Sequence, residues 1–138
     1  MTEIAKSCSD GRDVIFTPKG MSMYPFIVGS RDSIVLRKEY IIRNGDIVAA
    51  RIPGKGCVLH RVYSLSGNQL TLMGDSNLYS TEVCALKDVL ATVAVIVRNG
   101  HRISCHSIRE RSAVKLWMCL LPIRRYLLWI LRKLRFRL

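Results

Sequence analysis

The spacing of the apolar residues changes near Gly100, and this change divides the chain into two regions of different secondary structure. Before Gly100, short runs rich in β-branched residues alternate with turn dipeptides such as Asn44-Gly45 and Gly67-Asn68, which is the pattern of a β protein. The predicted strands are Val14–Thr17, Ser33–Arg37, Asp46–Arg51, Val58–Leu65, Gln69–Met73 and Ala91–Arg98. Their short lengths and regular breaks predict a mainly β fold built on an antiparallel, barrel-like sheet.

Beyond Gly100 the apolar residues follow a helical period. Steps of four and three residues connect Leu116, Leu120, Ile123, Leu127, Ile130 and Leu134 into one stripe. Pro122 interrupts this pattern, and proline has no amide donor for a helix interior, so we expect a kink or two helices with the proline near the start of the second. The positions between the apolar residues are rich in arginine, which predicts a basic amphipathic helical tail.

The chain has 138 residues, of which 49% are apolar and 23% charged. This length and composition are those of one globular domain with a single core. We therefore expect a flexible N-terminal arm over residues 1–12, a β-rich core over residues 13–100, a connector over residues 101–111 and the helical tail over residues 112–138.

The formal net charge is +12, and in the last thirty residues Glu110 alone opposes a concentration of arginine and lysine. Such a surface attracts polyanions, either nucleic acid or an anionic membrane. The leucine-rich spacing between Trp117, Tyr126 and Trp129 suits a lipid or protein face better than a nucleic-acid surface. We expect peripheral contact with an anionic membrane through residues 112–138, whose apolar runs are too short to span a bilayer. The alternative is that the apolar side of the tail packs on the β core.

The cysteines and the C-terminal histidines do not form a pattern typical of metal sites. The five cysteines are widely spaced and include no CxxC pair, which favours free thiols in a reducing compartment. His101 and His106 lie in a polar segment without a second group of ligands, so we expect exposed loop histidines and no cofactor. Residues 1–19 contain no apolar run of signal-peptide length. A cytoplasmic location, with peripheral contact at the inner face of the membrane, is expected.

Three segments carry the candidate chemistry: GMSMYPFI at Gly20–Ile27, NGDIVAARI at Asn44–Ile52, and VLHRV followed by LMGDSN within Val58–Asn77. Each is a weak signal alone, since a serine after glycine is commonly a turn residue and a histidine in a strand is commonly structural. In this order the segments resemble the signal-peptidase and LexA superfamily of serine peptidases. That superfamily has a G-x-SM-x-P box, then a strand that starts with Gly-Asp, then a strand that carries the catalytic base.

The resemblance covers about Gly20 to Val97 and implies that Ser22 is the nucleophile and His60 its general base. The base strand reads Leu59-His60-Arg61-Val62, and a histidine at this position is similar to the archaeal and endoplasmic-reticulum signal peptidases, whereas bacterial type I enzymes carry lysine. The chemistry is consistent, because a serine hydroxyl needs a neighbouring base to accept its proton. A neutral imidazole provides one without the deep burial that a lysine base requires.

The third catalytic residue is Asp75 by the resemblance, because Gly74-Asp75-Ser76-Asn77 matches the GD-[NG]-N box of the superfamily. Its carboxylate is expected to orient His60, with Glu82 ranked second and an Asx turn as the structural alternative for Asp75. Asp32 and Asp46 are expected to shape turns at the starts of strands.

The oxyanion hole is expected to depend on backbone amides around Ser22. Many signal peptidases have a serine two residues before the nucleophile, and its hydroxyl is a second donor to the oxyanion. Here that position is Gly20, whose missing side chain is expected to let another chain segment approach closely.

The predicted function is a serine endopeptidase that cleaves a leader or precursor protein through Ser22 and His60. One alternative is a self-processing protein of the UmuD kind that cuts its own N-terminal arm, although the Ala-Gly or Cys-Gly pair typical of that branch is absent before Ser22. The other alternative is a non-catalytic basic module that binds membrane or nucleic acid.

Overall fold

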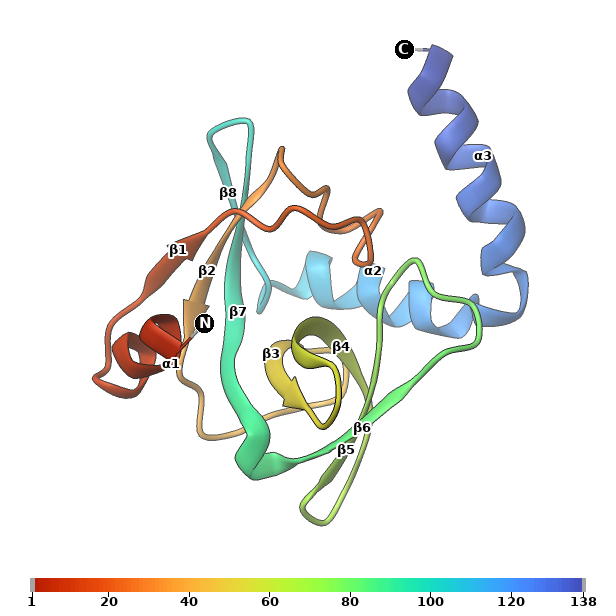
Figure 1. Ribbon diagram of the computed structural model, residues 1–138. Coiled ribbons are helices and arrows are strands. Elements are labelled where there is room, and N and C mark those ends of the chain that lie inside the picture. Colours follow the sequence, from red (N-terminus) through yellow and green to blue (C-terminus); the bar gives the residue numbers. More distant parts are fainter. Residues whose placement is uncertain (1, 138) are drawn as a thin grey trace.

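The computed structural model describes residues 2–137 and shows a curled antiparallel sheet followed by helices (Figure 1). The strands are β1 (Val14–Phe16), β2 (Ser33–Arg37), β3 (Ile47–Ile52), β4 (Gly56–Ser66), β5 (Gln69–Met73), β6 (Glu82–Ala85), β7 (Val89–Arg98) and β8 (His101–Ser104). The helices are α1 (Thr2–Ser9), α2 (Ile108–Cys119) and α3 (Arg124–Arg137), with short 3-10 turns at Leu86–Asp88 and Leu121–Ile123. The sheet order is β1-β2-β7-β3-β4-β5-β6, and β8 pairs with β7. This half-barrel with C-terminal helices confirms the predicted fold class.

The curl of the sheet covers both faces of its central strand β3. Ile47 and Ala49 belong to one apolar cluster, with residues of β2 and β7. Val48 and Ala50 belong to a second cluster, with residues of β4 and β5. Successive side chains of a strand point to opposite faces, so the continuous apolar run of β3 reflects burial on both sides.

The first residues, expected as a flexible arm over 1–12, contain the helix α1. Cys8 of this helix is fully buried and Ile4 packs against the same apolar cluster of the sheet. The Cys8 thiol also lies 3.7 Å from the carbonyl oxygen of Leu36. An eight-residue helix is too short to show a clear apolar period, so its contacts with the sheet hold it in place. Met1 lies outside the described residues.

The connector expected over residues 101–111 also has regular structure. β8 forms a hairpin with β7 through Asn99 and Gly100, which both adopt positive φ angles. α2 then begins at Ile108, before the predicted residue 112, because the hydroxyl oxygen of Ser107 accepts a hydrogen bond from the Glu110 amide at 3.2 Å. Pro122 lies in the 3-10 turn between α2 and α3, so the two-helix alternative for the tail is the one observed.

The C-terminal helices pack on the body of the protein through a face that the predicted apolar stripe describes only in part, since Leu127 of the stripe packs inward. Val114, Trp117 and Leu128 are buried, and Arg124 is fully buried among them. By contrast, the stripe residues Leu116, Ile123, Ile130 and Leu134 are 61%, 47%, 47% and 50% exposed. Within residues 2–137, no helix has the length and apolar character needed to cross a bilayer.

Candidate active site

Ser22 lies in the long connection between β1 and β2, beside the connection that joins β5 to β6. Its carbonyl oxygen accepts a hydrogen bond from the Ser76 amide at 3.0 Å, and the Ser76 hydroxyl donates to the carbonyl oxygen of Met21 at 2.9 Å. The next residue, Met23, is buried in the apolar cluster beneath the sheet. The exposed side chain of Ser22 is therefore carried on a backbone that is anchored on both sides.

His60 lies in the middle of β4, opposite Val48 of β3, and its side chain is buried. A Cβ atom placed on Gly74 would lie 2.6 Å from the carbonyl oxygen of Ser22 and 3.3 Å from Nε2 of His60. The structure thus brings the Ser22 backbone and the imidazole together at Gly74. A side chain at position 74 would push this contact apart, which explains why glycine is needed there.

Glu82 binds the other side of the imidazole. Its Oε2 lies 2.8 Å from Nδ1 of His60, and both side chains are more than nine-tenths buried. Glu82 is on β6, where it pairs in register with Leu72 of β5. Its second carboxylate oxygen lies 3.3 Å from Nζ of Lys55, whose side chain is 57% exposed. The carboxylate therefore fixes Nδ1 and leaves Nε2 on the side of Gly74 and Ser22, the order of groups found in serine hydrolase triads.

Asp75 does not contact the imidazole but binds Arg61, which corrects the expectation that it orients His60. The Arg61 guanidinium donates two hydrogen bonds to the Asp75 carboxylate, at 2.7 and 2.6 Å, and a third to the Gly45 carbonyl at 2.7 Å. Both side chains are buried. Burial would lower the pKa of Arg61, but the adjacent carboxylate raises it above its ordinary value. Asp75 is therefore half of a buried ion pair beside the site.

The C-terminal helices brace the segment that carries Asp75. The Trp117 indole donates to the Asp75 carbonyl oxygen at 3.0 Å, and the Arg124 guanidinium donates to the Asn77 carbonyl oxygen at 3.2 Å. Arg124 also donates to the Tyr63 hydroxyl, and it lies over the Trp117 ring at 5.1 Å. Arg124 is one of the arginines of the predicted basic tail, but it is not on the surface of that tail: it is an internal link between the helices and the β5–β6 connection.

Asp32 and Asp46 accept turn amides, as the sequence predicts. Asp32 accepts from the Val28 amide at 2.9 Å and from Arg31 at 2.8 Å. Burial tends to raise the pKa of Asp32, but these hydrogen bonds outweigh it and hold the pKa below its ordinary value. Asp46 accepts from the Arg43 amide at 2.9 Å.

The close approach expected at Gly20 occurs at a different glycine. A Cβ on Gly20 would meet no atom within 4 Å, whereas a Cβ on Gly29 would collide with the carbonyl oxygen of Gly20. The absence of a side chain at Gly29 lets these two parts of the β1–β2 connection cross. The space beside Gly20 is open, two residues before Ser22.

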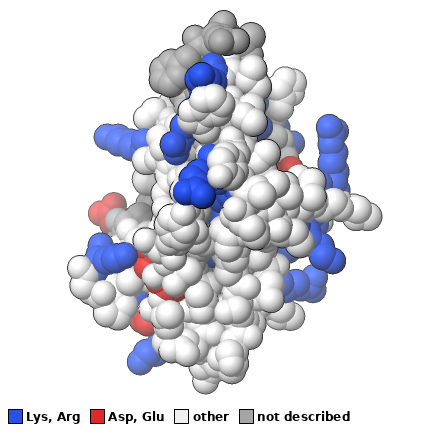
Figure 2. All heavy atoms as spheres, turned by 90° about the vertical axis from the view of Figure 1, so that its right-hand side faces the viewer, with Lys and Arg blue, Asp and Glu red and all other residues white. Residues whose placement is uncertain are grey.

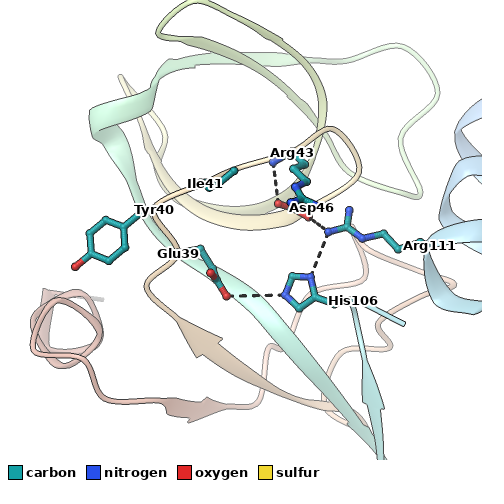
Figure 3. Close-up of a pocket in the computed structure, with 7 residues that line it drawn as sticks. All are labelled: Glu39, Tyr40, Ile41, Arg43, Asp46, His106 and Arg111. Carbon is teal, nitrogen blue, oxygen red and sulfur yellow. Dashed lines mark hydrogen bonds and ion pairs between the residues drawn. The ribbon is translucent and has the colours of Figure 1, made fainter. Parts of the chain in front are cut away.

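A separate hollow of about 580 Å³ lies between the β2–β3 connection and the start of α2 (Figure 3). Arg111 extends into it from α2, with Nη2 lying 2.7 Å from the carboxylate of Asp46 and 3.2 Å from Nδ1 of His106. His106 also faces Glu39, at 3.9 Å. His106 is in a turn, as predicted, whereas His101 is on β8 and not in an irregular connector. Arg111 therefore links α2 to Asp46, the residue before β3, and to the turn that carries His106.

Glu82, which ranked second in the sequence analysis, is the carboxylate that lies against His60. It shares the inward face of β6 with Cys84, while Val83 between them points outward. The strand therefore shows a charged residue where an apolar one is usual, which hides it from a search for apolar alternation. The number of residues between His60 and Asp75, or between His60 and Glu82, does not indicate which of the two carboxylates lies beside the imidazole.

Comparison with known protein families gives one match that agrees with this geometry. A family described as Peptidase S24-like matches residues 2–97, which include Ser22, His60, Asp75 and Glu82. The C-terminal helices lie beyond the matched region. No curated protein sequence matches the chain significantly. Since the match covers more than half of the chain, this protein belongs to the Peptidase S24-like family of the LexA and signal-peptidase superfamily.

Proposed function

We propose that this protein is a serine endopeptidase that cleaves a leader or precursor protein, with Ser22 as nucleophile, His60 as general base and Glu82 as the carboxylate that orients the base. The observation that carries the proposal is the hydrogen bond of 2.8 Å between His60 Nδ1 and Glu82, which leaves Nε2 on the side of Ser22. Membership of a peptidase family supports the reaction class.

The arrangement supports acyl transfer through Ser22. As the Ser22 oxygen attacks the carbonyl carbon of the scissile bond, its proton passes to Nε2 of His60. The Glu82 carboxylate stabilises the imidazolium that forms. The imidazolium then gives its proton to the leaving amine, the carbon–nitrogen bond breaks, and an ester on Ser22 remains. Water attacks this ester with His60 again as base, which releases the new carboxyl terminus and restores the serine.

Backbone amides around Ser22 are the donors proposed for the developing oxyanion. The hydroxyl donor that many signal peptidases place two residues earlier is replaced by Gly20. One side-chain donor contributes about 10²–10³ in kcat in a serine peptidase. This site is therefore proposed to operate with a weaker oxyanion hole than a two-donor signal peptidase.

The choice of His60 over a lysine base rests on burial. A lysine acts as a base when burial favours loss of its proton. Lys55 is the lysine next to the base strand, but it is largely exposed and forms an ion pair with Glu82. His60 is buried and faces Gly74 with the ring nitrogen that Glu82 does not use. We therefore assign the site to the Ser-His branch of the superfamily.

The self-processing alternative has less support. Its substrate would be the N-terminal segment, but residues 2–9 form a helix whose Cys8 is buried against the sheet. Self-cleavage would require this helix to leave the core. Cleavage of a separate precursor requires no such rearrangement.

The test is mass spectrometry of the purified protein mixed with small precursor proteins encoded beside it. The wild type and a Ser80→Ala control, which removes an exposed serine of the β5–β6 connection, are expected to give the same cleavage products. Ser22→Ala is expected to give none. Equal cleavage by Ser22→Ala would reject the proposal, and a wild-type chain that shortens only itself would support the self-processing alternative.

A further inference from the structure

The outward face of α3 carries large apolar and aromatic side chains that no described part of the chain covers. Tyr126 is 60% exposed and Trp129 is 59% exposed. Ile123, Ile130 and Leu134 continue the same face and are about half exposed. The opposite side of the helix is the one that packs inward, through Arg124 and Leu128. The face of α3 that packs on the protein and the face that is exposed to solvent therefore lie on opposite sides of the helix.

Basic side chains accompany this exposed face. Arg125 lies over the Tyr126 ring at 5.2 Å, and Lys133 lies over the Trp129 ring at 4.2 Å. Arg132 is seven residues from Arg125, two helical turns away, so both point to the same side. Figure 2 looks at the side of the molecule where α3 lies and shows blue basic side chains among white ones on its upper half. No residue of α3 is acidic.

This combination of groups favours a lipid surface over other partners. Aromatic and branched aliphatic side chains beside arginine and lysine are suited to the boundary between headgroups and acyl chains of an anionic bilayer. A nucleic-acid surface would use the basic residues but leave Ile123, Ile130 and Leu134 in water. The fourteen residues of α3 give a helix of about 21 Å, too short to cross the ~30 Å hydrocarbon core.

We propose that the outward face of α3 and of the 3-10 turn before it, made of Ile123, Tyr126, Trp129, Ile130 and Leu134 with Arg125, Arg132 and Lys133, docks on the surface of an anionic membrane. The helix lies along the membrane plane while its inward face stays packed on the protein. Since Arg124 and Trp117 join α2 and α3 to the β5–β6 connection, docking holds the peptidase domain at the membrane surface.

Deleting the tail is a poor test, because it would remove Trp117, Arg124 and Leu128 from the interior. Substitutions on the outward face avoid this problem. The double variant Arg125→Glu/Arg132→Glu changes two exposed side chains. The control Lys6→Glu/Arg12→Glu makes the same change in net charge at α1 and the turn after it, on the far side of the sheet from α3 (Figure 1).

The first measurement is flotation of the full chain with vesicles of phosphatidylcholine, with or without 30 mol% phosphatidylglycerol, about a typical anionic content. Binding to the anionic vesicles is expected to weaken with added salt and to fall by about tenfold or more in Arg125→Glu/Arg132→Glu. The control variant should lose clearly less. Equal losses in the two variants, or no binding to anionic vesicles, would overturn the proposal.

Tryptophan fluorescence provides a second, local measurement. The chain has two tryptophans, of which Trp117 is buried and Trp129 is exposed. Anionic vesicles should shift the emission to shorter wavelength in the wild type and leave it unchanged in Trp129→Phe. If the protein is dimeric without vesicles and iodide does not quench the fluorescence of Trp129, the partner of this face is a second copy of the chain. A preference for duplex oligonucleotide over vesicles would indicate nucleic acid, and either result would reject the membrane proposal.

The inference does not depend on peptidase activity. Ser22→Ala is expected to bind vesicles as the wild type does, because Ser22 is not on the docking face. Loss of cleavage and loss of vesicle binding are therefore separate outcomes.

Discussion

The two carboxylates near His60 should give opposite results when each is changed to its amide. Glu82→Gln keeps a hydrogen-bond acceptor beside Nδ1 of His60 but removes the charge that stabilises the imidazolium. Loss of the orienting carboxylate in a serine triad lowers kcat about 10⁴-fold. The Lys55 ammonium beside Glu82 offsets part of the charge that acts on the imidazolium. We therefore expect kcat/KM to fall by about 10²–10⁴-fold, with the full effect of a triad carboxylate as the upper limit. The free energy of unfolding should fall by about 1–2 kcal/mol, because the buried hydrogen bond to His60 is weakened but the amide still accepts from Nδ1 and exposed Lys55 remains in water.

Asp75→Asn should act on stability first. It removes the negative charge and one of the two carboxylate oxygens that accept from Arg61, so the buried guanidinium keeps the amide oxygen and the Gly45 carbonyl as acceptors but loses its counter-charge. Removing one partner of a buried ion pair costs about 3–5 kcal/mol, a large part of the ~5–15 kcal/mol that stabilises a typical domain. The folded fraction should nevertheless keep more activity than Glu82→Gln, because Asp75 does not contact the imidazole.

The assay measures urea unfolding and kcat/KM on the same preparations, with kcat/KM corrected for the folded fraction. Full activity in Glu82→Gln together with a stable but inactive Asp75→Asn would reject Glu82 as the orienting carboxylate. That result would return the orienting role to Asp75, the residue that the sequence ranked first.

Three further outcomes follow from single residues. Gly20→Ser places a hydroxyl in open space two residues before Ser22, and it should raise kcat as a second oxyanion donor, with the effect of an established donor, about 10²–10³-fold, as the upper limit; unchanged kcat would show that this hydroxyl does not reach the oxyanion. Burial raises the pKa of the Cys105 thiol to about 11, so at pH 8 a thiol reagent should label exposed Cys119 on the order of a hundredfold faster than Cys105, as peptide mapping would show. The pKa of Asp32 is lower in the folded protein, so its ionised carboxylate stabilises the fold at pH values above the ordinary carboxyl pKa of about 3.9, and this stabilisation is lost as the pH falls through the folded-state pKa. The free energy of unfolding, measured by urea unfolding, should therefore decrease as the pH is lowered from about 4, and it should decrease less steeply in Asp32→Asn.

The strands of the core could be predicted because their apolar pattern and turn residues act locally. β2 and β5 have the predicted bounds, and β1, β3, β4 and β7 differ from them at their ends. β6 and β8 were missed. β8 has the largely polar sequence HRIS, and it is held by pairing with β7 and by the single apolar contact of Ile103 with the core.

The site could be predicted only where a motif specified it. Ser22 and His60 belong to sequence motifs whose combination of residue types is uncommon. Glu82 belongs to no such motif, and its contact with His60 exists only once β6 has paired with β5. This contact is a property of tertiary structure. The burial of Arg124 has the same cause, because the neighbouring Tyr63 and Trp117 that accommodate its charge come from β4 and α2.

The apolar stripe of the tail was predicted correctly as a helical pattern but does not show which side packs inward. The period specifies a helix. The inward face, however, is selected by the fit of Trp117 and Leu128 against Tyr24 and Val28 of the β1–β2 connection. A face rich in leucine and isoleucine was left outside as a result, and this is the face for which we propose a membrane partner.

Ser22 and His60 are proposed to act as one catalytic unit, and kcat/KM for one cleaved precursor, measured with Ser22→Ala, His60→Ala and the double variant, tests this proposal. Each single change should remove nearly all activity, at least about 10³-fold, and the double variant should be hardly worse, because groups that act as a unit are strongly non-additive. Full activity in His60→Ala, together with its loss in Lys55→Ala, would contradict the account and identify a lysine as the base.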